Sequence, residues 1–164
     1  MRITIAVLTV LLSTAPPEVP EENVTQGSPP AASAAEAGAK ELIAAIAAGD
    51  PARARGFFFP ADAFDLVKDL PVPARYHRKL VGWYDEDIMK EHRRFRKGDW
   101  RFEKLELGRC RWKEKGTEGN KLPYWSCRGN FVTATDGNRK RRFEIRVLIN
   151  WGRNWYVTHL GPIR

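Results

Sequence analysis

The last stretch of the chain, Arg142 to Leu160, constrains the fold most because apolar and polar residues alternate in it. Apolar side chains occupy every second position: Phe143, Ile145, Val147, Ile149 and Trp151. The turn sequence Gly152-Arg153-Asn154 then leads into a second alternating run, Trp155, Val157 and His159. Alternation with period two on both sides of a Gly/Asn turn predicts a β-hairpin with one buried face.

The 60 or so residues after Asp99 carry further strand signals. The expected strands are Arg101 to Lys113, Pro123 to Thr135, Arg141 to Trp151 and Asn154 to Leu160. They are separated by the turn sequences Gly116 to Asn120, Asp136 to Asn138 and Gly152 to Asn154. Short alternating runs joined by Gly/Asn turns predict a four-stranded antiparallel meander.

The residues before Asp99 show helical signals instead. The expected helices are Glu36 to Ala48 with Gly49 as its C-terminal cap, a short turn from Ala52 to Gly56 after Asp50-Pro51, Asp62 to Asp69, and Ala74 to Lys97. Gly82 allows a bend within the last of these helices. The sequence therefore predicts the α+β class, with N-terminal helices packed on a curved four-stranded antiparallel sheet.

The two cysteines test this register. The midpoint of Cys110 and Cys127 falls inside the first turn, so a hairpin places them opposite each other, and we expect a structural disulfide. The same register pairs Trp112 with Trp125 and Gly108 with Gly129.

A three-residue turn at Asp136 to Asn138 pairs Phe131 with Phe143, Gly129 with Ile145 and Cys127 with Val147. The last turn pairs Ile149 with Val157 and Val147 with His159. One face then collects Cys110, Trp112, Trp125, Cys127, Phe131, Phe143, Ile145, Val147, Ile149, Trp151, Trp155 and Val157.

The first 35 residues differ in composition from the rest. Residues 1–15 combine Met1-Arg2, a short apolar run and the small residues Ser13 to Ala15, a pattern typical of a signal peptide. An N-terminal core strand is the alternative. Residues 16–35 are rich in Pro, Glu and Ala and contain no aromatic residue, so we expect a disordered linker. Residues 36–164 then form a single domain, without a transmembrane segment in the mature chain, that is exported to the periplasm or the extracellular space.

The charge of the predicted domain points to an acidic partner. The whole chain carries +8, and leaving out Arg2 and the four N-terminal glutamates gives +11 for residues 40–164. A basic exported domain fits an acidic protein or an anionic envelope polymer, and a solvated basic surface is the alternative. Export disfavours nucleic acid as the partner.

Arginines are expected to gather on one face of the sheet. The five are Arg109, Arg111, Arg128, Arg142 and Arg146. Arginine binds anions through paired N–H groups and stacks on aromatic rings, so this face is a candidate contact surface. Trp112 and Trp125, on the opposite, apolar face, are further candidate ligand-binding residues. A solvated outer face remains the alternative.

Helices followed by an antiparallel sheet that ends in Asn150-Trp151-Gly152-Arg153-Asn154-Trp155-Tyr156-Val157-Thr158-His159-Leu160 resemble the nuclear-transport-factor-2-like superfamily. Ketosteroid isomerase and scytalone dehydratase share that cone-shaped roll. The resemblance covers roughly residues 40–160, and the cystatin-like arrangement is a neighbouring alternative. It implies a pocket between helices and sheet, and its members include enzymes and pure binding domains, so the fold does not assign a function.

If that pocket exists, its polar lining would come from His159, Tyr84 and Asp85, with His77 as a further candidate. A histidine beside a carboxylate and a phenol can act in general acid–base catalysis. The isomerase and dehydratase patterns do not map onto these positions, and a buried histidine that is merely hydrogen-bonded is the alternative. We expect no metal site and no cofactor, because the sequence has neither metal-ligand spacing nor a glycine-rich phosphate loop.

Three functions remain open from the sequence. The first is a non-enzymatic exported binding module that uses the arginine face for an acidic partner or the pocket for a small apolar ligand. The second is a small pocket enzyme of the isomerase, dehydratase or hydrolase type that uses His159. The third is an envelope assembly factor or an inhibitor of the immunity type.

Overall fold

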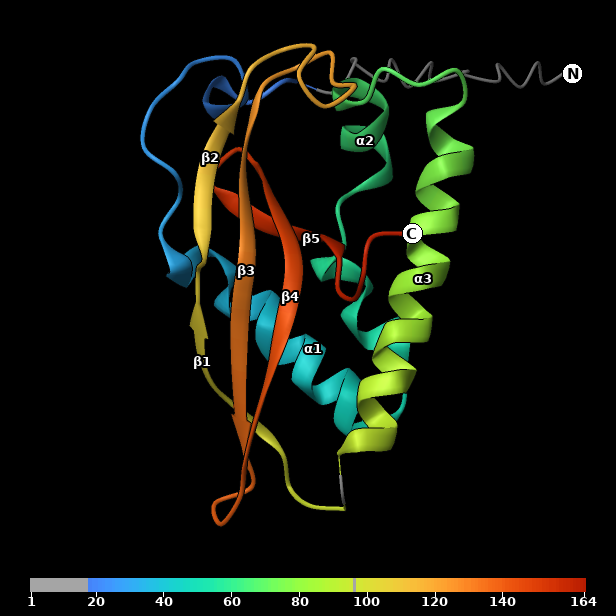
Figure 1. The fold of residues 1–164 in the computed structure, drawn as a ribbon, viewed down its shortest axis with the longest axis vertical. Helices are drawn as coiled ribbons and strands as arrows, with labels where there is room; N and C mark the ends of the chain where they lie inside the picture. The colour runs from blue at the N-terminus through green and yellow to red at the C-terminus, as the bar shows by residue number, and fades with distance from the viewer. Residues whose placement is uncertain (1–17, 96) are drawn as a thin grey trace, which may run out of the picture.

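The computed structural model describes residues 18–95 and 97–164 as an α+β fold, in which helices pack on a curved antiparallel sheet (Figure 1). The expected signal peptide, Met1 to Ala15, lies outside the described residues. The helical elements are η1 (Glu21–Asn23), η2 (Ala32–Ala35), α1 (Glu36–Ala48), η3 (Pro51–Phe57), α2 (Ala61–Val67) and α3 (Pro73–Arg94). The strands are β1 (Arg101–Glu106), β2 (Arg109–Lys113), β3 (Tyr124–Thr135), β4 (Lys140–Trp151) and β5 (Asn154–His159).

Two helix ends have the predicted capping residues, Gly49 and Asp50, whereas α3 ends at Arg94, three residues before the expected Lys97. Gly49 ends α1 in the left-handed conformation with φ of 67°, which glycine adopts without steric cost. The carboxylate of Asp50 accepts the N–H of Ala52 at 3.2 Å and so caps η3. α2 ends at Val67, and a proline-rich segment follows it. The last proline of that segment, Pro73, is the first residue of α3, where proline is well tolerated.

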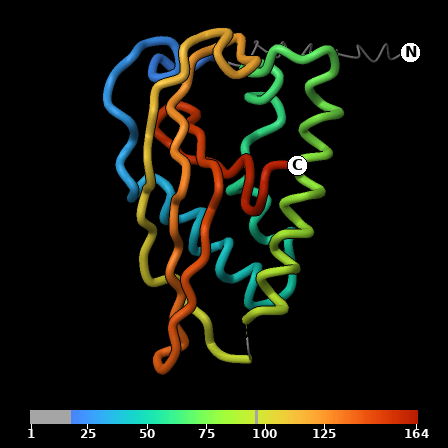
Figure 2. The backbone as a smooth tube through the Cα atoms, viewed as in Figure 1, coloured from blue at the N-terminus to red at the C-terminus, as the bar shows by residue number. Residues whose placement is uncertain are grey.

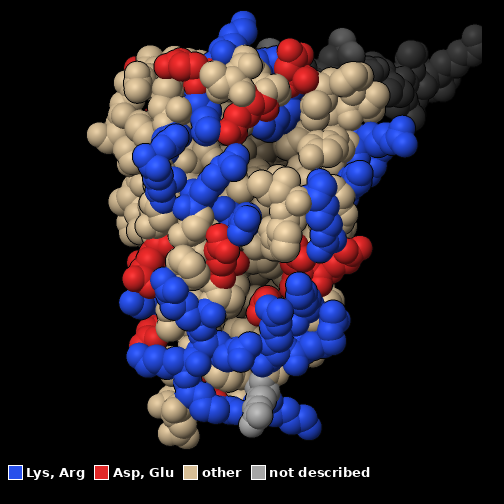
Figure 3. All heavy atoms as spheres, viewed as in Figure 1, with Lys and Arg blue, Asp and Glu red and all other residues tan. Residues whose placement is uncertain are grey.

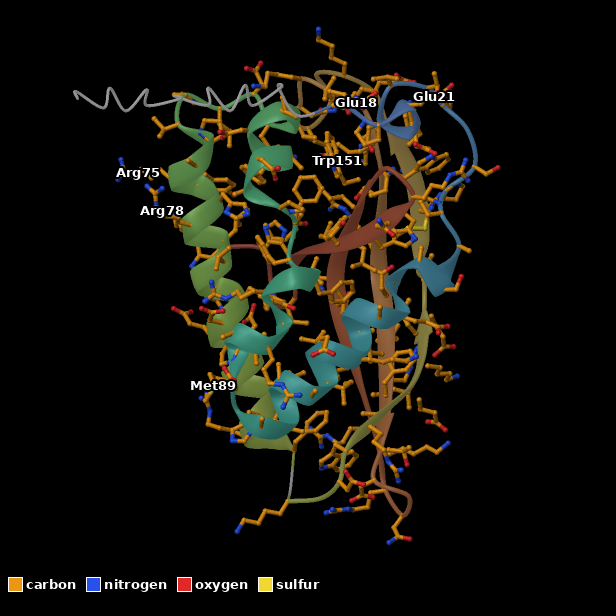
Figure 4. All side chains as sticks on the ribbon, turned by 180° about the vertical axis from the view of Figure 1, so that it is seen from behind. Glu18, Glu21, Arg75, Arg78, Met89 and Trp151 are labelled. Carbon is orange, nitrogen blue, oxygen red and sulfur yellow. A yellow bond between two sulfur atoms is a disulfide. The ribbon has the colours of Figure 1, made fainter. Side chains whose placement is uncertain are left out.

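α3 runs unbroken through Gly82, and its inner face packs against the rest of the molecule. Leu80, Tyr84 and Ile88 are buried there at helical spacing. Arg75 and Arg78 project from the helix away from the sheet (Figure 4). His92, in the last turn of this helix, uses Nδ1 to contact the carbonyl of Ile46 at 2.7 Å, which ties α3 to the end of α1. No helix in the described residues has both the length and the apolar character needed to cross a bilayer.

The sheet has five strands, because the expected strand Arg101 to Lys113 is broken in two. β1 and β2 both pair with β3, on which β4 and then β5 follow. The break falls at Gly108, where a Cβ atom would lie 2.1 Å from the carbonyl oxygen of Arg128. Gly129 opposite has φ of +71°, and Gly108 donates its N–H to the side chain of Asn130 at 3.1 Å. The expected pair of Gly108 with Gly129 is therefore replaced by a distorted junction that bends the sheet.

The first hairpin has the predicted register. Cys110 lies opposite Cys127 and Trp112 opposite Trp125. The two cysteines form a disulfide, and the tryptophan rings meet edge-on with centroids 5.6 Å apart. Cys127 is fully buried in the core, so the disulfide joins β2 to the interior of the sheet.

The predicted register of the second hairpin is wrong by one residue. Thr135 pairs with Lys140, so the turn contains four residues rather than three. The Asp136 carboxylate stabilises the longer turn by accepting the N–H groups of Asn138 at 3.1 Å and Arg139 at 2.8 Å.

The shifted register changes which residues face each other. Phe131 lies opposite Glu144, Val132 opposite Phe143, Asn130 opposite Ile145, and Cys127 opposite Leu148. Phe131 therefore leaves the expected apolar face, and the guanidinium of Arg142 lies 3.5 Å from the centre of its ring.

The third hairpin is partly as predicted. Val147 pairs with His159, but a bulge follows, so that Ile149 lies opposite Tyr156 rather than Val157. β5 pairs only with the final part of β4 and crosses behind it toward α3 (Figure 2). As a result, among the described strands the first half of β4 pairs with β3 alone.

The described part of the expected linker, Glu18 to Ala35, packs against the sheet and is not a detached segment. Asn23 is fully buried; its side chain donates to the carbonyl of Asn150 at 3.3 Å and accepts the N–H of Gly152 at 2.6 Å. The indole of Trp155 donates to the carbonyl of Pro30 at 3.1 Å. The side chain of Asn23 and the carbonyl of Pro30 thus hold this segment against the sheet, although its composition is that of a linker, and the packed unit begins well before Glu36.

Candidate ligand pocket

A pocket of about 240 Å³ lies between α2, α3 and the sheet. One part of its wall is apolar and contains Phe64, Leu70, Tyr76, Leu80, Val147, Ile149 and Ile163. The other part is polar and contains Lys68, Glu118, Tyr124, Arg128, Thr158 and His159. Such a division suits a ligand with an apolar body and a polar head.

The loop between β2 and β3 places Glu118 in the lining of the pocket. Asn120 is buried in this loop and holds it together: its side chain accepts the N–H of Glu118 at 2.9 Å and donates to the carbonyl of Leu122 at 2.8 Å. The loop is also joined to the end of α2, because Asp69 donates its N–H to the carbonyl of Gly119 at 2.8 Å. Glu118 is thereby fixed beside Lys68, which directly follows α2.

A chain of polar contacts connects these elements. Lys68 donates to the hydroxyl of Tyr124 at 2.8 Å, and Tyr124 donates to Glu118 at 3.1 Å. Glu118 also forms ion pairs with Lys113 at 2.6 Å and Arg128 at 3.3 Å. Three cations therefore surround one carboxylate, which leaves the polar end of the pocket with an excess of positive charge.

The pKa shifts of the pocket residues follow from burial and from the excess of positive charge around Glu118. Burial lowers the pKa of Lys68, an effect that Glu118 partly opposes. Burial alone would raise the pKa of Glu118, but its hydrogen bonds and ion pairs with Lys113, Tyr124 and Arg128 outweigh burial, and its pKa is lowered. Burial and the nearby Glu118 raise the pKa of Tyr124, so the phenol stays protonated. Beside its cations, the site thus holds the ionised carboxylate of Glu118 and the protonated hydroxyl of Tyr124.

His159 lies in the pocket wall with an unused nitrogen. Its Nδ1 contacts the hydroxyl of Thr158 at 3.3 Å, while its Nε2 is buried and has no hydrogen-bond partner in the described part of the chain. Burial, and then the charges of Lys68 and Arg128, lower the pKa of His159, so the ring is neutral at pH 7. A buried polar atom without a partner costs free energy, and a ligand in the pocket can supply the missing contact.

The other expected acid–base residues lie elsewhere. Tyr84 donates to the carbonyl of Ala54 at 3.2 Å and Asp85 forms an ion pair with Arg55, and neither lines the pocket with His159. His77 contacts the carbonyl of Phe59 at 2.7 Å. Burial raises the pKa of Tyr84 and of Asp85, the latter against the effect of Arg55. The structure therefore does not bring His159, Tyr84 and Asp85 together as a catalytic set.

The expected arginine face divides into two places. Arg109, Arg111 and Arg128 line a shallow surface depression together with Lys113. Arg142 and Arg146 line a different cavity, between β4 and α3. Trp112 and Trp125 each lie two positions from a cysteine and so share the cysteine face of β2 and β3, which is opposite to the face of Arg109 and Arg111. The two tryptophans and the arginines do not share one site.

Three residues of the pocket were not singled out from the sequence: Lys68, Glu118 and Tyr124. They lie in three separate segments and follow no spacing pattern that would connect them. The sequence offers one indication of this site, the position of Lys68 between an apolar helix and a proline-rich segment. A lysine at such a position does not by itself predict a binding site. Within residues 18–95 and 97–164 there is no group of three or more His, Cys, Asp or Glu side chains that could hold a metal ion.

Comparisons with models of protein families, with curated proteins and with solved structures gave no significant match.

Proposed function

We propose that this chain is an exported binding protein whose pocket holds a small amphipathic anion, with an apolar body against α2, α3 and β4 and an anionic head at Lys68. The nuclear-transport-factor-2-like roll, with a ligand between helices and sheet, is part of this proposal. The contact of Lys68 with Tyr124 at 2.8 Å, in the polar part of a pocket whose other lining is apolar, carries it.

The charges at the pocket favour an anion over a neutral or cationic head. Lys68 directs one hydrogen bond to Tyr124 and forms no ion pair with any described residue, which leaves N–H groups for a ligand. Glu118 is already held by Lys113 and Arg128 and does not balance all three cations. Because Lys68 is partly buried, an anion at this position would be shielded from water, which strengthens its hydrogen bonds.

Titration calorimetry with decanoate, decanol and decyltrimethylammonium tests the proposal. We expect decanoate to bind more tightly than decanol, and the ammonium compound not to bind. Lys68→Met should weaken decanoate binding at least tenfold, since a hydrogen bond to a charged group contributes about 1.5–3 kcal/mol. Lys104→Met, at an exposed lysine of β1, is the matched control and should bind as the wild type does. Equal affinity of decanoate for the wild type and Lys68→Met would contradict the proposal.

The disulfide supports export. Disulfides persist in oxidising compartments such as the periplasm and the extracellular space. The bond between Cys110 and Cys127 joins two neighbouring strands of the fold, as expected for a structural disulfide. Together with the signal-peptide pattern of residues 1–15, this favours a mature protein outside the cytoplasm.

A pocket enzyme that uses His159 is the second candidate. The observation in its favour is the buried Nε2 without a partner on a neutral imidazole, as a general base requires. Turnover of decanoyl esters that is lost in His159→Gln and kept in Lys68→Met would favour this enzyme over the binding protein.

A further inference from the structure

A second cavity, of about 320 Å³, lies between β4 and the C-terminal half of α3. Its apolar lining includes Phe143, Leu160 and Pro162. Its walls carry Lys90 and Arg94 from α3, and Arg141, Arg142 and Arg146 from β4. We call this cavity the β4 groove. It is separate from the ligand pocket.

The β4 groove contains a strand edge without a neighbour. Lys140 to Glu144 pair with β3 on one side, and among the described strands none pairs with them on the other. Arg146 donates its N–H to the carbonyl of Leu160 at 3.2 Å, so its backbone points away from β3. Backbone groups alternate in direction along a strand, so the N–H and C=O groups of Arg142 and Glu144 also point into the groove. A free strand edge of this kind can accept an added strand.

The charges around this edge are mostly positive. The acids of the groove are already engaged: Glu91 with Arg94 at 2.7 Å, Glu144 with Arg146 at 3.4 Å, and Asp87 with Arg164 at 2.8 Å.

Two cations of the groove remain without such a partner. Lys90 and Arg141 form no ion pair with any residue that the structure describes. Lys and Arg side chains dominate the lower part of the face seen in Figure 3, where the start of β4 and the end of α3 lie in Figure 1. An occupant of the groove should therefore be acidic.

We propose that the β4 groove binds an acidic, extended peptide segment of a partner protein, which adds to β4 as a further strand. The peptide backbone pairs with Arg142 and Glu144, and its carboxylates meet Lys90 and Arg141. Strand addition of this type derives affinity from main-chain hydrogen bonds and specificity from side chains on alternate positions. The free backbone edge favours a peptide over an anionic polysaccharide, whose backbone has no regular row of amide N–H and C=O groups to pair with it.

The test measures binding of a fluorescein-labelled ten-residue peptide of alternating Glu and Thr by fluorescence anisotropy. The key variant is Glu144→Pro, which removes the N–H that faces the groove. Proline is tolerated on an edge strand when the lost N–H does not pair within the sheet. Glu144→Gln is its matched control, because it removes the same negative charge and keeps the N–H.

The two variants separate strand addition from attraction between charges. Strand addition predicts that Glu144→Pro binds the peptide at least tenfold more weakly than Glu144→Gln. Attraction alone predicts that both variants bind at least as tightly as the wild type, because each loses a negative charge. Equal binding by the two variants would overturn the proposal.

Two further measurements keep the test decisive if Glu144→Pro does not fold. The same peptide with an N-methyl group on every residue keeps its charge but presents no backbone N–H on either edge, and wild-type protein should bind it at least tenfold more weakly. Lys90→Ser/Arg141→Ser should also weaken binding, by about fivefold or more, whereas Arg109→Ser/Arg111→Ser, with the same loss of charge elsewhere, should not. If the methylated peptide binds as well as the unmodified one, and dextran sulfate displaces both, the groove binds anionic polymers and the proposal fails.

Discussion

The side chain of Asn23 donates to the backbone carbonyl of Asn150 at 3.3 Å, although 127 positions separate the two residues in the sequence. Both side chains are fully buried, and Asn150 in turn accepts the N–H of Trp125 at 2.7 Å. The N-terminal segment is therefore joined through Asn23 to the turn between β4 and β5 and to the start of β3. It belongs to the folded unit.

Asn23→Ala should lower the free energy of unfolding by about 2 kcal/mol, because it leaves the buried N–H of Gly152 without a partner. Urea denaturation followed by tryptophan fluorescence measures the change. Thr25→Ala alters an exposed residue two positions later and serves as the control, with a change below about 0.5 kcal/mol. Equal losses in the two variants would show that the segment does not stabilise the fold.

Both cysteines should be unreactive in the oxidised protein. A thiol assay in denaturant without reductant is expected to detect no free thiol, since Cys110 and Cys127 are bonded. The double variant Cys110→Ala/Cys127→Ala should have a free energy of unfolding about 2–3 kcal/mol lower than that of the wild type, because the bond closes a loop of 17 residues in the unfolded chain. Reductant should destabilise the wild type and leave the double variant unchanged.

Gly108→Ala should destabilise the fold by about 3 kcal/mol, because its Cβ would lie 2.1 Å from the carbonyl oxygen of Arg128 and 2.4 Å from that of Gly129. Rigid backbone atoms on the partner strand cannot move aside as a flexible side chain can. Gly82→Ala is the matched control, because its Cβ meets nothing within 4 Å in an exposed part of α3. That variant should gain about 0.5–1 kcal/mol of helix stability. Similar thermal melting curves for the two variants would contradict the proposed strand junction.

His159 should make stability fall as the pH drops below about 6.5. Burial, Lys68 and Arg128 lower its folded-state pKa below the value of 6.5 for an unfolded histidine, so the unfolded chain takes up the proton first. Of the other titratable groups at the pocket, Glu118 is already ionised and Tyr124 is neutral in this range. The stability contributed by the neutral ring is thus complete above pH 6.5 and is lost as the pH falls toward the folded-state pKa.

The difference in unfolding free energy between pH 7.5 and pH 5.5 measures this effect when the wild type is compared with His159→Gln. The variant should lose less stability over that range. Because all other ionisable groups are shared, an identical loss in both proteins would show that His159 titrates as it does in the unfolded chain.

The sequence predicts most of the elements because their signals are local. Gly49 and Asp50 mark helix ends through their own conformation and side chain, and the positions of Cys110 and Cys127 set the first hairpin. The second hairpin depends instead on Asp136, whose carboxylate stabilises a turn one residue longer than the Asp-Gly-Asn sequence indicates. A shift of one residue moves Phe131 to the other face, so a small error in the turn alters the whole strand.

The candidate site was less predictable than the fold. His159 could be named because it ends an alternating strand, but its neighbours Lys68 and Glu118 reach it through the contact between the β2–β3 loop and the end of α2. Contacts between loops leave no periodic signal in the sequence. Likewise, the proline- and glutamate-rich composition of the N-terminal segment indicates a linker, whereas a single buried asparagine fixes it to the sheet.

The one-sided pairing of β4 also determines how quickly its amide protons exchange with solvent. The N–H groups of Phe143 and Ile145 face β3 and should exchange only when the hairpin opens. Those of Arg142 and Glu144 face the β4 groove and should exchange within the dead time of a deuterium experiment. The first half of β4 should therefore show alternating fast and slow amides, while β3, which has strand neighbours on both sides, should be slow at nearly every position.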